Sequence, residues 1–576
     1  MTIASRGLRD AVACLRGQHQ DLLSQILDSG FCLWLGSGVS RERFMPLGAL
    51  LEHLLDQLHQ RIRPSDPGCP YLSALRTILH DIGSATDVDP GAHIGTWEAS
   101  TRLRIIKDLI GKYSDVFGVH IEDPGGSLEI WWDVLKLQEI YAEKKDGPDA
   151  EHRLTALLVE EGVFKELFTT NWDTLIEDAA LEVRNGRSPI LGVYVQPERM
   201  AASPGERARL RKVHGCARSA VNDPTVFKDL FIVTKSHIQK WKEFQRWDPF
   251  RDELRVSLRK NPSLLVGISA QDWNLQLEIL QAYMTQENSA SVRLVFSGES
   301  LTHHQKVVLR GAHAAAVYQA NAAKIDAQSL VQLYGKPLLG AIYVINLVEK
   351  LKLLLAKGQE DLRPFFTFTE VWVSYLEEWL FLRADQAGQA EGYRNLAFEV
   401  SAELARNFGI WRDQKVPQSR REYTAFYDRN TADLRCDDNV VGLGYHWTLL
   451  VIALLLEVEK RGHWIVGAPG GNDAEFGHLT LSANDKKVTV FILGRSLGMS
   501  ALEAHGVNLE GSPIVVIYPL GLSAKSRKDA PTRQFAGSAS PYAAHEVWFQ
   551  ESISGSTSVD EVLVTLRAEM ASGGLV

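Results

Sequence analysis

The stretch Phe168-Thr169-Thr170-Asn171-Trp172-Asp173 joins an apolar run to a polar loop. The apolar run predicts a buried β-strand that ends where the loop begins. Three further segments have the same form, an apolar run followed by a short loop rich in glycine or polar residues. They are Gly36-Ser37-Gly38-Val39-Ser40, Val213-His214-Gly215 and Gly267-Ile268-Ser269-Ala270-Gln271-Asp272. In an open parallel sheet, ligands bind at the carboxyl ends of the strands. We therefore expect the four loops to meet at one pocket.

Length and composition set the broad class. A chain of 576 residues predicts roughly two to four domains at ~150 residues each. The net charge of -9 argues against a surface that coats nucleic acid. Charged residues interrupt the first sixteen positions, so no signal segment is expected. The most apolar run, 447–456, is about half of the ~20 residues that a membrane helix needs, which predicts a cytoplasmic protein without a membrane contact.

Alternation of strands and helices predicts an α/β fold, a Rossmann-like, mainly parallel sheet, over residues 1–357. A helical insertion is expected between the first two strands, at 71–145, and long helices at 8–27 and 341–356. The expected strands are 31–35, 167–170, 190–195, 212–214, 264–268 and 292–297.

The second half predicts a helical connector at 358–445 and a second α/β domain at 446–576. One helix, three strands, a helix and a strand follow one another there, an order that resembles the core of restriction-endonuclease-like folds. Asp485-Lys486-Lys487 offers the acid-x-Lys of a nuclease, and Asp473 and Glu475 lie upstream. However, Asn484-Asp485 is typical of a hairpin turn, so we favour a non-catalytic regulatory or partner-binding domain. The basic loop 525–533 is expected to be a solvated loop.

The residues of these loops have structural and functional interpretations. Asp173 suits a helix entrance, and Thr174 with Glu177 fits a capping box, although capping does not require the preceding Thr-Thr-Asn. His214 follows a strand, where an imidazole faces the crevice and accepts a proton near neutral pH. The glycines of the loop 36–40 would let backbone N–H groups approach a pyrophosphate.

Taken in order, the four motifs resemble the prokaryotic sirtuin-like family over roughly residues 25 to 320. The resemblance implies NAD as the ligand. It implies that Asn171 and Asp173 hold the ribose next to nicotinamide and the attacking water, and that His214 is the general base. The remaining NAD contacts would come from the other loop residues, which are Gly36, Ser37, Gly38, Ser40, Thr170, Gly267, Ser269 and Asp272.

The cysteines mark a departure from protein-deacylating sirtuins, which carry a zinc module with two Cys-x-x-Cys pairs. The five cysteines here form no such pair, so neither zinc nor another metal is expected. The resemblance therefore points to the branch that hydrolyses NAD, commonly as an anti-phage effector. That branch implies a homo-oligomer or a defence partner such as a short Argonaute or an ATPase, with nucleic acid contacted indirectly.

Two other functions remain open. The first half could sense NAD or ADP-ribose without cleaving it, coupled to a nuclease-like or scaffolding second half, which could also be an Argonaute-partner-type domain. A protein deacylase is disfavoured by the missing cysteines.

Overall fold

The computed structural model describes most of residues 7–357 and separate stretches after them. Within 7–357 the gaps are 29, 64, 67, 144–146, 185, 187–190, 198–205 and 271–291. Beyond 357 the described residues are 377, 381, 451, 454–455, 457–459, 461–467, 478–492, 513–518, 544–553, 556 and 558–575. Asp272, Asp473, Glu475, the loop 525–533 and nearly all of the predicted connector lie outside the described residues.

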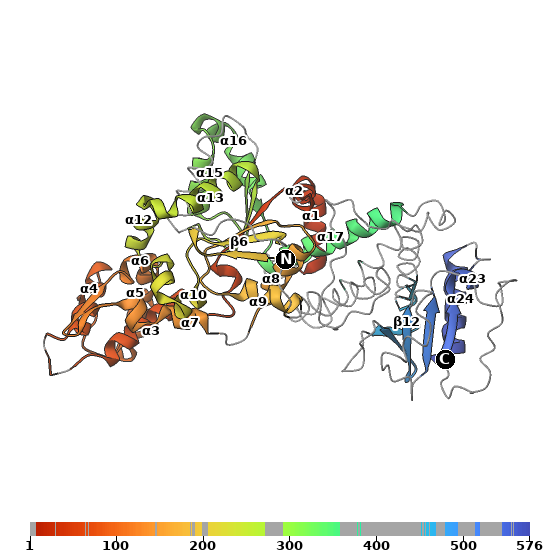
Figure 1. Cartoon of the computed structure of the whole chain (residues 1–576), viewed down its shortest axis with the longest axis horizontal. Coiled ribbons are helices and arrows are strands. Elements are labelled where there is room, and N and C mark those ends of the chain that lie inside the picture. The colour runs from red at the N-terminus through yellow and green to blue at the C-terminus, as the bar shows by residue number, and fades with distance from the viewer. Residues whose placement is uncertain are drawn as a thin grey trace.

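A seven-stranded parallel sheet organises the first half (Figure 1), which confirms the predicted Rossmann-like α/β architecture. Its order is β5-β6-β4-β1-β7-β8-β9, and each neighbouring pair is parallel. The strands are β1 (Cys32–Leu35), β4 (Glu166–Thr169), β5 (Leu191–Tyr194), β6 (Ala208–Lys212), β7 (Ser263–Val266), β8 (Leu294–Ser297) and β9 (Leu330–Val331).

The predicted bounds of β6 were wrong. We expected a strand at 212–214, whereas β6 begins at Ala208 and ends at Lys212. Its cationic residues, Arg209, Arg211 and Lys212, are unusual for a buried strand. In the fold, however, Arg211 is completely buried, and it forms ion pairs with Glu166 and Glu253.

Two layers of helices cover the sheet, because alternate strand residues face opposite sides. Leu33 and Leu35 of β1 belong to one buried cluster, and Cys32 and Trp34 to another. The first side is covered by α1 (Leu8–Gln18), α2 (Gln20–Leu27), α8 (Ala150–Glu160), α9 (Leu175–Val183) and α17 (Gly335–Lys357). The second side is covered by α13 (Asp248–Lys260), α15 (His303–Ala312) and α16 (Ala315–Gln328).

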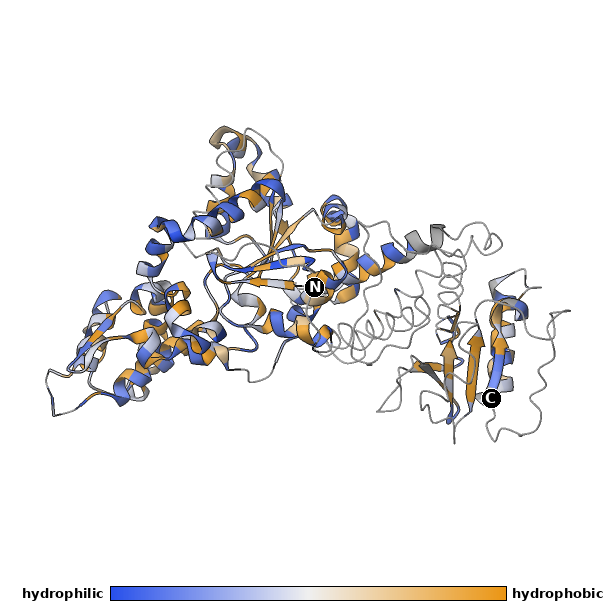
Figure 2. Ribbon diagram, viewed as in Figure 1, coloured by the Kyte–Doolittle hydropathy of each residue, from blue (hydrophilic) through white to orange (hydrophobic). Residues whose placement is uncertain are grey.

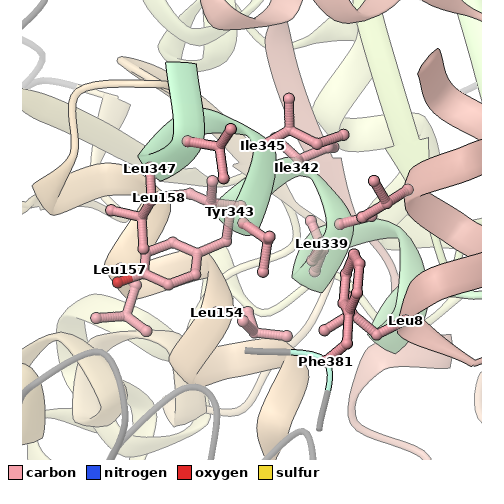
Figure 3. Packing of buried hydrophobic residues seen from close by; sticks show 14 of the residues in the cluster. Leu8, Leu154, Leu157, Leu158, Leu339, Ile342, Tyr343, Ile345, Leu347 and Phe381 are labelled. Carbon is pink, nitrogen blue, oxygen red and sulfur yellow. The ribbon is translucent and has the colours of Figure 1, made fainter. Parts of the chain in front are cut away.

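Close packing of α17 against α8 is visible in Figure 3, where Tyr343 lies against Leu157 and Leu158. Leu8 of α1 and Phe381 meet the same cluster. The predicted single helix at 8–27 was wrong, because the backbone leaves the helical region at His19 and separates α1 from α2.

The helical insertion predicted at 71–145 is present, and with the helix that precedes it and residues 217–233 it forms a second buried cluster. It lies at one end of the molecule, across the sheet from α17 (Figure 1). Its helices are α3 (Leu47–Gln60), α4 (Pro70–Asp81), α5 (Ala99–Gly111), α6 (Tyr113–Val116) and α7 (Leu137–Ala142). The sequence reading missed its hairpin, which is β2 (His120–Asp123) and β3 (Gly126–Glu129). The helices α10 (Ala217–Asn222), α11 (Pro224–Phe227) and α12 (Lys235–Glu243) follow β6.

A five-stranded sheet forms the last part of the described chain, and its strands are mainly hydrophobic (Figure 2). The strands are β10 (Ile465–Gly467), β11 (His478–Ala483), β12 (Lys486–Ile492), β13 (Ile514–Tyr518) and β14 (Ala544–Trp548). The pairs β10–β11 and β11–β12 are antiparallel, and the next two are parallel. The helices α23 (Phe549–Ser552) and α24 (Val559–Met570) follow.

The hairpin predicted at Asn484-Asp485 is confirmed. Both residues have positive φ, 48° and 64°, and they connect β11 to β12 in a two-residue turn. Left-handed conformation at both central residues is what such a turn requires. Turn geometry thus accounts for this Asn-Asp pair.

No helix in the described ranges is long and apolar enough to cross a lipid bilayer.

Candidate functional site

The four predicted loops leave the same edge of the sheet. They follow β6, β4, β1 and β7, which are adjacent in that order and parallel. From β1 the chain adds β4 and β6 on one side and β7 on the other, so the strand order reverses beside β1. Open α/β sheets bind ligands at such a reversal point. The four loops therefore lie at one edge of the sheet, and the single pocket that we expected them to form stays a prediction.

Three glycines interlock the loops that follow β1 and β7. A Cβ atom on Gly36 would lie 2.4 Å from the carbonyl oxygen of Gly267, and one on Gly38 would lie 2.7 Å from the Gly267 Cα. Gly267 itself has a φ of 68°, which L-residues rarely adopt. The Gly38 N–H donates to the Gly267 carbonyl at 3.1 Å. The close contact between the two loop backbones is therefore sufficient to require glycine at these three positions.

The backbone of this loop is already engaged within the protein. The N–H groups of Gly36, Gly38, Val39 and Ser40 donate to carbonyl groups of Val266, Gly267, Gly36 and Ser37 respectively. The expectation that the glycines free these N–H groups for a pyrophosphate is therefore wrong at those four positions. Ser37 keeps an exposed side chain beside them.

Gly36→Ala is expected to lower the free energy of unfolding by about 1–3 kcal/mol, because backbone atoms of the β7 loop occupy the space of the new methyl group. Chemical denaturation measures the change. The control is Gly17→Ala, since a Cβ at Gly17 in α1 meets nothing within 4 Å. That helical substitution should stabilise the protein by about 0.5–1 kcal/mol. Equal effects of the two substitutions would contradict the interlock.

Asn171 connects the loops after β4 and β1. The Thr169 hydroxyl donates to the Leu35 carbonyl at 2.8 Å and accepts the Asn171 N–H at 3.0 Å. The Asn171 Nδ2 then donates to the Ser40 hydroxyl at 3.1 Å. Only 7% of Asn171 is exposed, and its Oδ1 finds no hydrogen-bond partner within the described part of the chain. A buried acceptor of this kind needs a donor, which a ligand hydroxyl or water can supply.

Asp173 is buried and lies two residues before α9. Its Oδ1 accepts the Leu175 N–H at 3.0 Å, so the predicted helix-entrance role is confirmed. The capping box predicted for Thr174 and Glu177 is wrong. The Thr174 hydroxyl donates to Asp178 at 3.1 Å, and Glu177 accepts from Lys212.

Lys212 and Glu177 form a buried ion pair behind the Asn-Trp-Asp turn. Their charged atoms lie 2.9 Å apart, and Lys212 also donates to the Asp173 carbonyl. Burial works to lower the pKa of Lys212, but the Glu177 carboxylate raises it above its ordinary value. Lys212 thus connects the backbone of the turn to Glu177 of α9. Neither role was predicted from the sequence, in which Lys212 follows Arg211 and precedes Val213.

His214 lies two residues beyond the end of β6 and is 7% exposed. Its carbonyl accepts the Ile232 N–H at 3.0 Å. Gly215 follows with a φ of 88°, and a Cβ there would lie 2.4 Å from the Leu230 carbonyl oxygen. Trp172 Nε1 donates to the Ile232 carbonyl at 3.3 Å, so the segment 230–232 contacts the loops of both His214 and Asn171.

The other residues predicted to contact NAD differ in their exposure and in their local contacts. Ser269 is exposed, and its carbonyl accepts the Thr302 hydroxyl at 3.3 Å, while Thr170 is half-buried. Gln305 donates to the Ile268 carbonyl at 2.8 Å, so the start of α15 supports the β7 loop. Ala270 is buried in the left-handed region, with a φ of 57°.

His152 of α8 joins the site from an element that our sequence reading left out. Its Nε2 lies 3.0 Å from the Ser40 hydroxyl, and its Nδ1 accepts the Asp149 N–H at 3.1 Å. Burial lowers the pKa of His152 to about 4. The spacing of Asp149 and His152 at a helix start was the available signal, since it is that of a capping box.

His152 makes stability depend on pH. The pKa of His152 is about 4 in the folded protein, compared with an ordinary value of 6.5. Its contribution to the free energy of unfolding is therefore fully present above pH 6.5 and is lost as the pH falls toward 4. Glu151 and Glu160, with pKa values raised to about 7 by burial, act in the opposite direction. The stability difference between wild type and His152→Gln should therefore narrow by about 2 kcal/mol from pH 7 to pH 5, measured by chemical denaturation. A difference that does not change with pH would contradict a neutral His152.

The strand order, the glycine interlock and the Asn171 turn place the predicted loops together at one edge of a Rossmann-like sheet. Residues 165–317 match the SIR2-like domain family. The match starts beside β4 and ends in α16, so it includes Asn171, Asp173 and His214 and leaves out the loop 36–40. The SIR2-like domain fits an NAD-related function and a sirtuin-like fold. A separate comparison with curated proteins found no match to the chain. Within the described residues, no group of three or more His, Cys, Asp or Glu side chains could hold a metal ion.

Proposed function

We propose that this protein hydrolyses NAD to nicotinamide and ADP-ribose, with Asn171, Asp173 and His214 at the reacting ribose. One observation carries the proposal. The SIR2-like domain brings these residues to one sheet edge on the loops of adjacent strands, where Asn171 Oδ1 is buried and unpaired among the described residues.

The chemistry suits such an edge. Nicotinamide leaves NAD with its positive charge neutralised, so the ribose carbon passes through an oxocarbenium-like transition state. A catalyst must hold the ribose, exclude bulk water and orient one water molecule. Asn171 Oδ1 would accept a hydrogen bond from the ribose or that water. The buried position strengthens this bond.

Proton transfer falls to His214, which would take a proton from a ribose hydroxyl. Water supplies the hydroxyl of ADP-ribose, and one proton is released with nicotinamide. Asp173 Oδ1 is occupied by the Leu175 N–H, so its proposed contact with the water belongs to Oδ2. Thr170, Ser37, Ser40, Ser269 and Asp272 would bind the rest of NAD, beside Gly36, Gly38 and Gly267.

We further propose that NAD cleavage serves anti-phage defence in the cytoplasm. The second sheet, or a partner such as a short Argonaute or an ATPase, would then control the NAD site, in a homo-oligomer or a complex. The sequence resemblance supports this setting, and the separate five-stranded sheet offers a regulatory part.

The test is nicotinamide release from NAD by the purified full chain, with and without its neighbouring gene product and nucleic acid. ADP-ribose is identified as the second product, and NAD binding is followed by calorimetry. Binding without cleavage under every condition would overturn the hydrolase and leave a sensor. Release that requires an acylated lysine peptide would instead indicate a deacylase.

A further inference from the structure

Both ring nitrogens of His152 form hydrogen bonds, which fix the orientation of the ring. A backbone N–H always donates, so the bond from Asp149 makes Nδ1 an acceptor. The neutral ring then carries its proton on Nε2, which donates to the Ser40 hydroxyl at 3.0 Å. The side chain is 1% exposed, which excludes competing water.

The start of α8 is itself anchored. Asp149 forms ion pairs with Arg43 at 3.1 Å and with Lys336 at 3.4 Å. It also caps the helix by accepting the Ala150 N–H at 2.7 Å. The imidazole therefore projects from a rigid point toward the loop that follows β1.

Ser40 connects His152 to Asn171 through hydrogen bonds. Its oxygen accepts from His152 Nε2 and from Asn171 Nδ2, at 3.0 and 3.1 Å, and Ser40 is only 4% exposed. Two donors hold the hydroxyl oxygen in one rotamer. With Nδ2 directed at Ser40, the Asn171 amide presents Oδ1 elsewhere, and Oδ1 is the atom that remains unpaired in the described part of the chain.

We propose that His152 is a positioning residue that acts through Ser40 to present Asn171 Oδ1 to the ribose. The inference rests on the proposed function. Without the Nε2–H donor, Ser40 can rotate, and the Asn171 amide can turn its NH₂ group toward the ligand. An NH₂ group cannot accept the proton of a ribose hydroxyl.

A merely structural role is the competing explanation, since His152 also completes a capping box. The chain contains a matched control in His237 of α12. His237 likewise sits three residues after a capping residue, Thr234, and burial lowers its pKa to about 4. Its Nδ1 accepts the N–H groups of Val233 and Thr234, at the start of its own helix.

The experiment compares full-length wild type with His152→Phe, His152→Gln, Ser40→Ala, the double variant His152→Phe/Ser40→Ala and His237→Phe. It measures kcat and KM for NAD hydrolysis, the Kd of ADP-ribose and the Tm. We expect His152→Phe and Ser40→Ala each to lower kcat by about 10- to 100-fold, while the Kd of ADP-ribose changes less than about threefold in His152→Phe. The double variant should be no slower than the slower single variant, and His152→Gln, which keeps an N–H donor, should recover most of kcat. His237→Phe should lower the Tm and leave kcat unchanged.

Wild-type kcat in Ser40→Ala would overturn the inference, and so would a double variant whose loss equals the product of the two single losses. If His152→Phe does not fold, His152→Gln tests the Nε2–H donor and Ser40→Ala, which keeps the Asp149–His152 bond, tests the link to Asn171. A wild-type protein that neither cleaves NAD nor binds ADP-ribose would overturn the proposed function and this inference together. That failure is recognised before any variant is compared.

Discussion

Replacing His214 or Asn171 with alanine is expected to reduce nicotinamide release by about 100-fold or more. His214→Ala removes the proposed proton acceptor, and Asn171→Ala removes the buried Oδ1 that faces no protein partner in the described residues. Both side chains are 7% exposed, so bulk water cannot take over their roles at equal efficiency. The measurement is the initial rate of nicotinamide release at saturating NAD.

Exposed residues of the same types provide controls. The His80 side chain is 82% exposed, and Asn222 is exposed at the end of α10, so alanine at either position should leave the rate unchanged. Asp173→Asn separates helix capping from chemistry, because the amide retains an oxygen for the Leu175 N–H but loses the charge. Wild-type rates in folded His214→Ala and Asn171→Ala would remove both residues from the mechanism.

Lys212→Met is expected to lower the free energy of unfolding by about 3–5 kcal/mol. The substitution leaves Glu177 without the ammonium group that lies 2.9 Å away, in a site where Lys212 is 1% exposed. It also removes the donor to the Asp173 carbonyl, so the turn that carries Asn171 should lose its fixed geometry. Chemical denaturation measures the first effect, and NAD cleavage reports the second.

The double variant Lys212→Met/Glu177→Met tests the cause. Removing both charges eliminates the uncompensated carboxylate, so stability should return to near the wild-type value. Activity should stay low, because methionine cannot donate to the Asp173 carbonyl. A double variant as unstable as Lys212→Met would show that packing, rather than an unpaired charge, causes the loss.

The amino-acid sequence was sufficient for most of the sheet and for the edge that carries the predicted site, although it misplaced β6 and gave no sign of β9. Apolar runs followed by polar loops predicted β1, β4 and β7, and the residues of these loops pointed to the SIR2-like domain that the comparison found at 165–317. Local chemistry was enough here, because strand formation and turn formation depend on neighbouring residues. The Asn484-Asp485 turn was predicted correctly for the same reason.

Tertiary structure alone decided how the loops are held. Ser40 lies 112 positions from His152 and 131 from Asn171, so no local pattern records their contacts. The glycines of the loop 36–40 were assigned to a phosphate, yet their N–H groups bind neighbouring backbone. Lys212 was predicted to begin a strand and Glu177 to complete a capping box, whereas the two form a buried ion pair. Such partners are chosen by which strands become neighbours in the sheet, because burial removes water and each polar group must then find a partner in the fold.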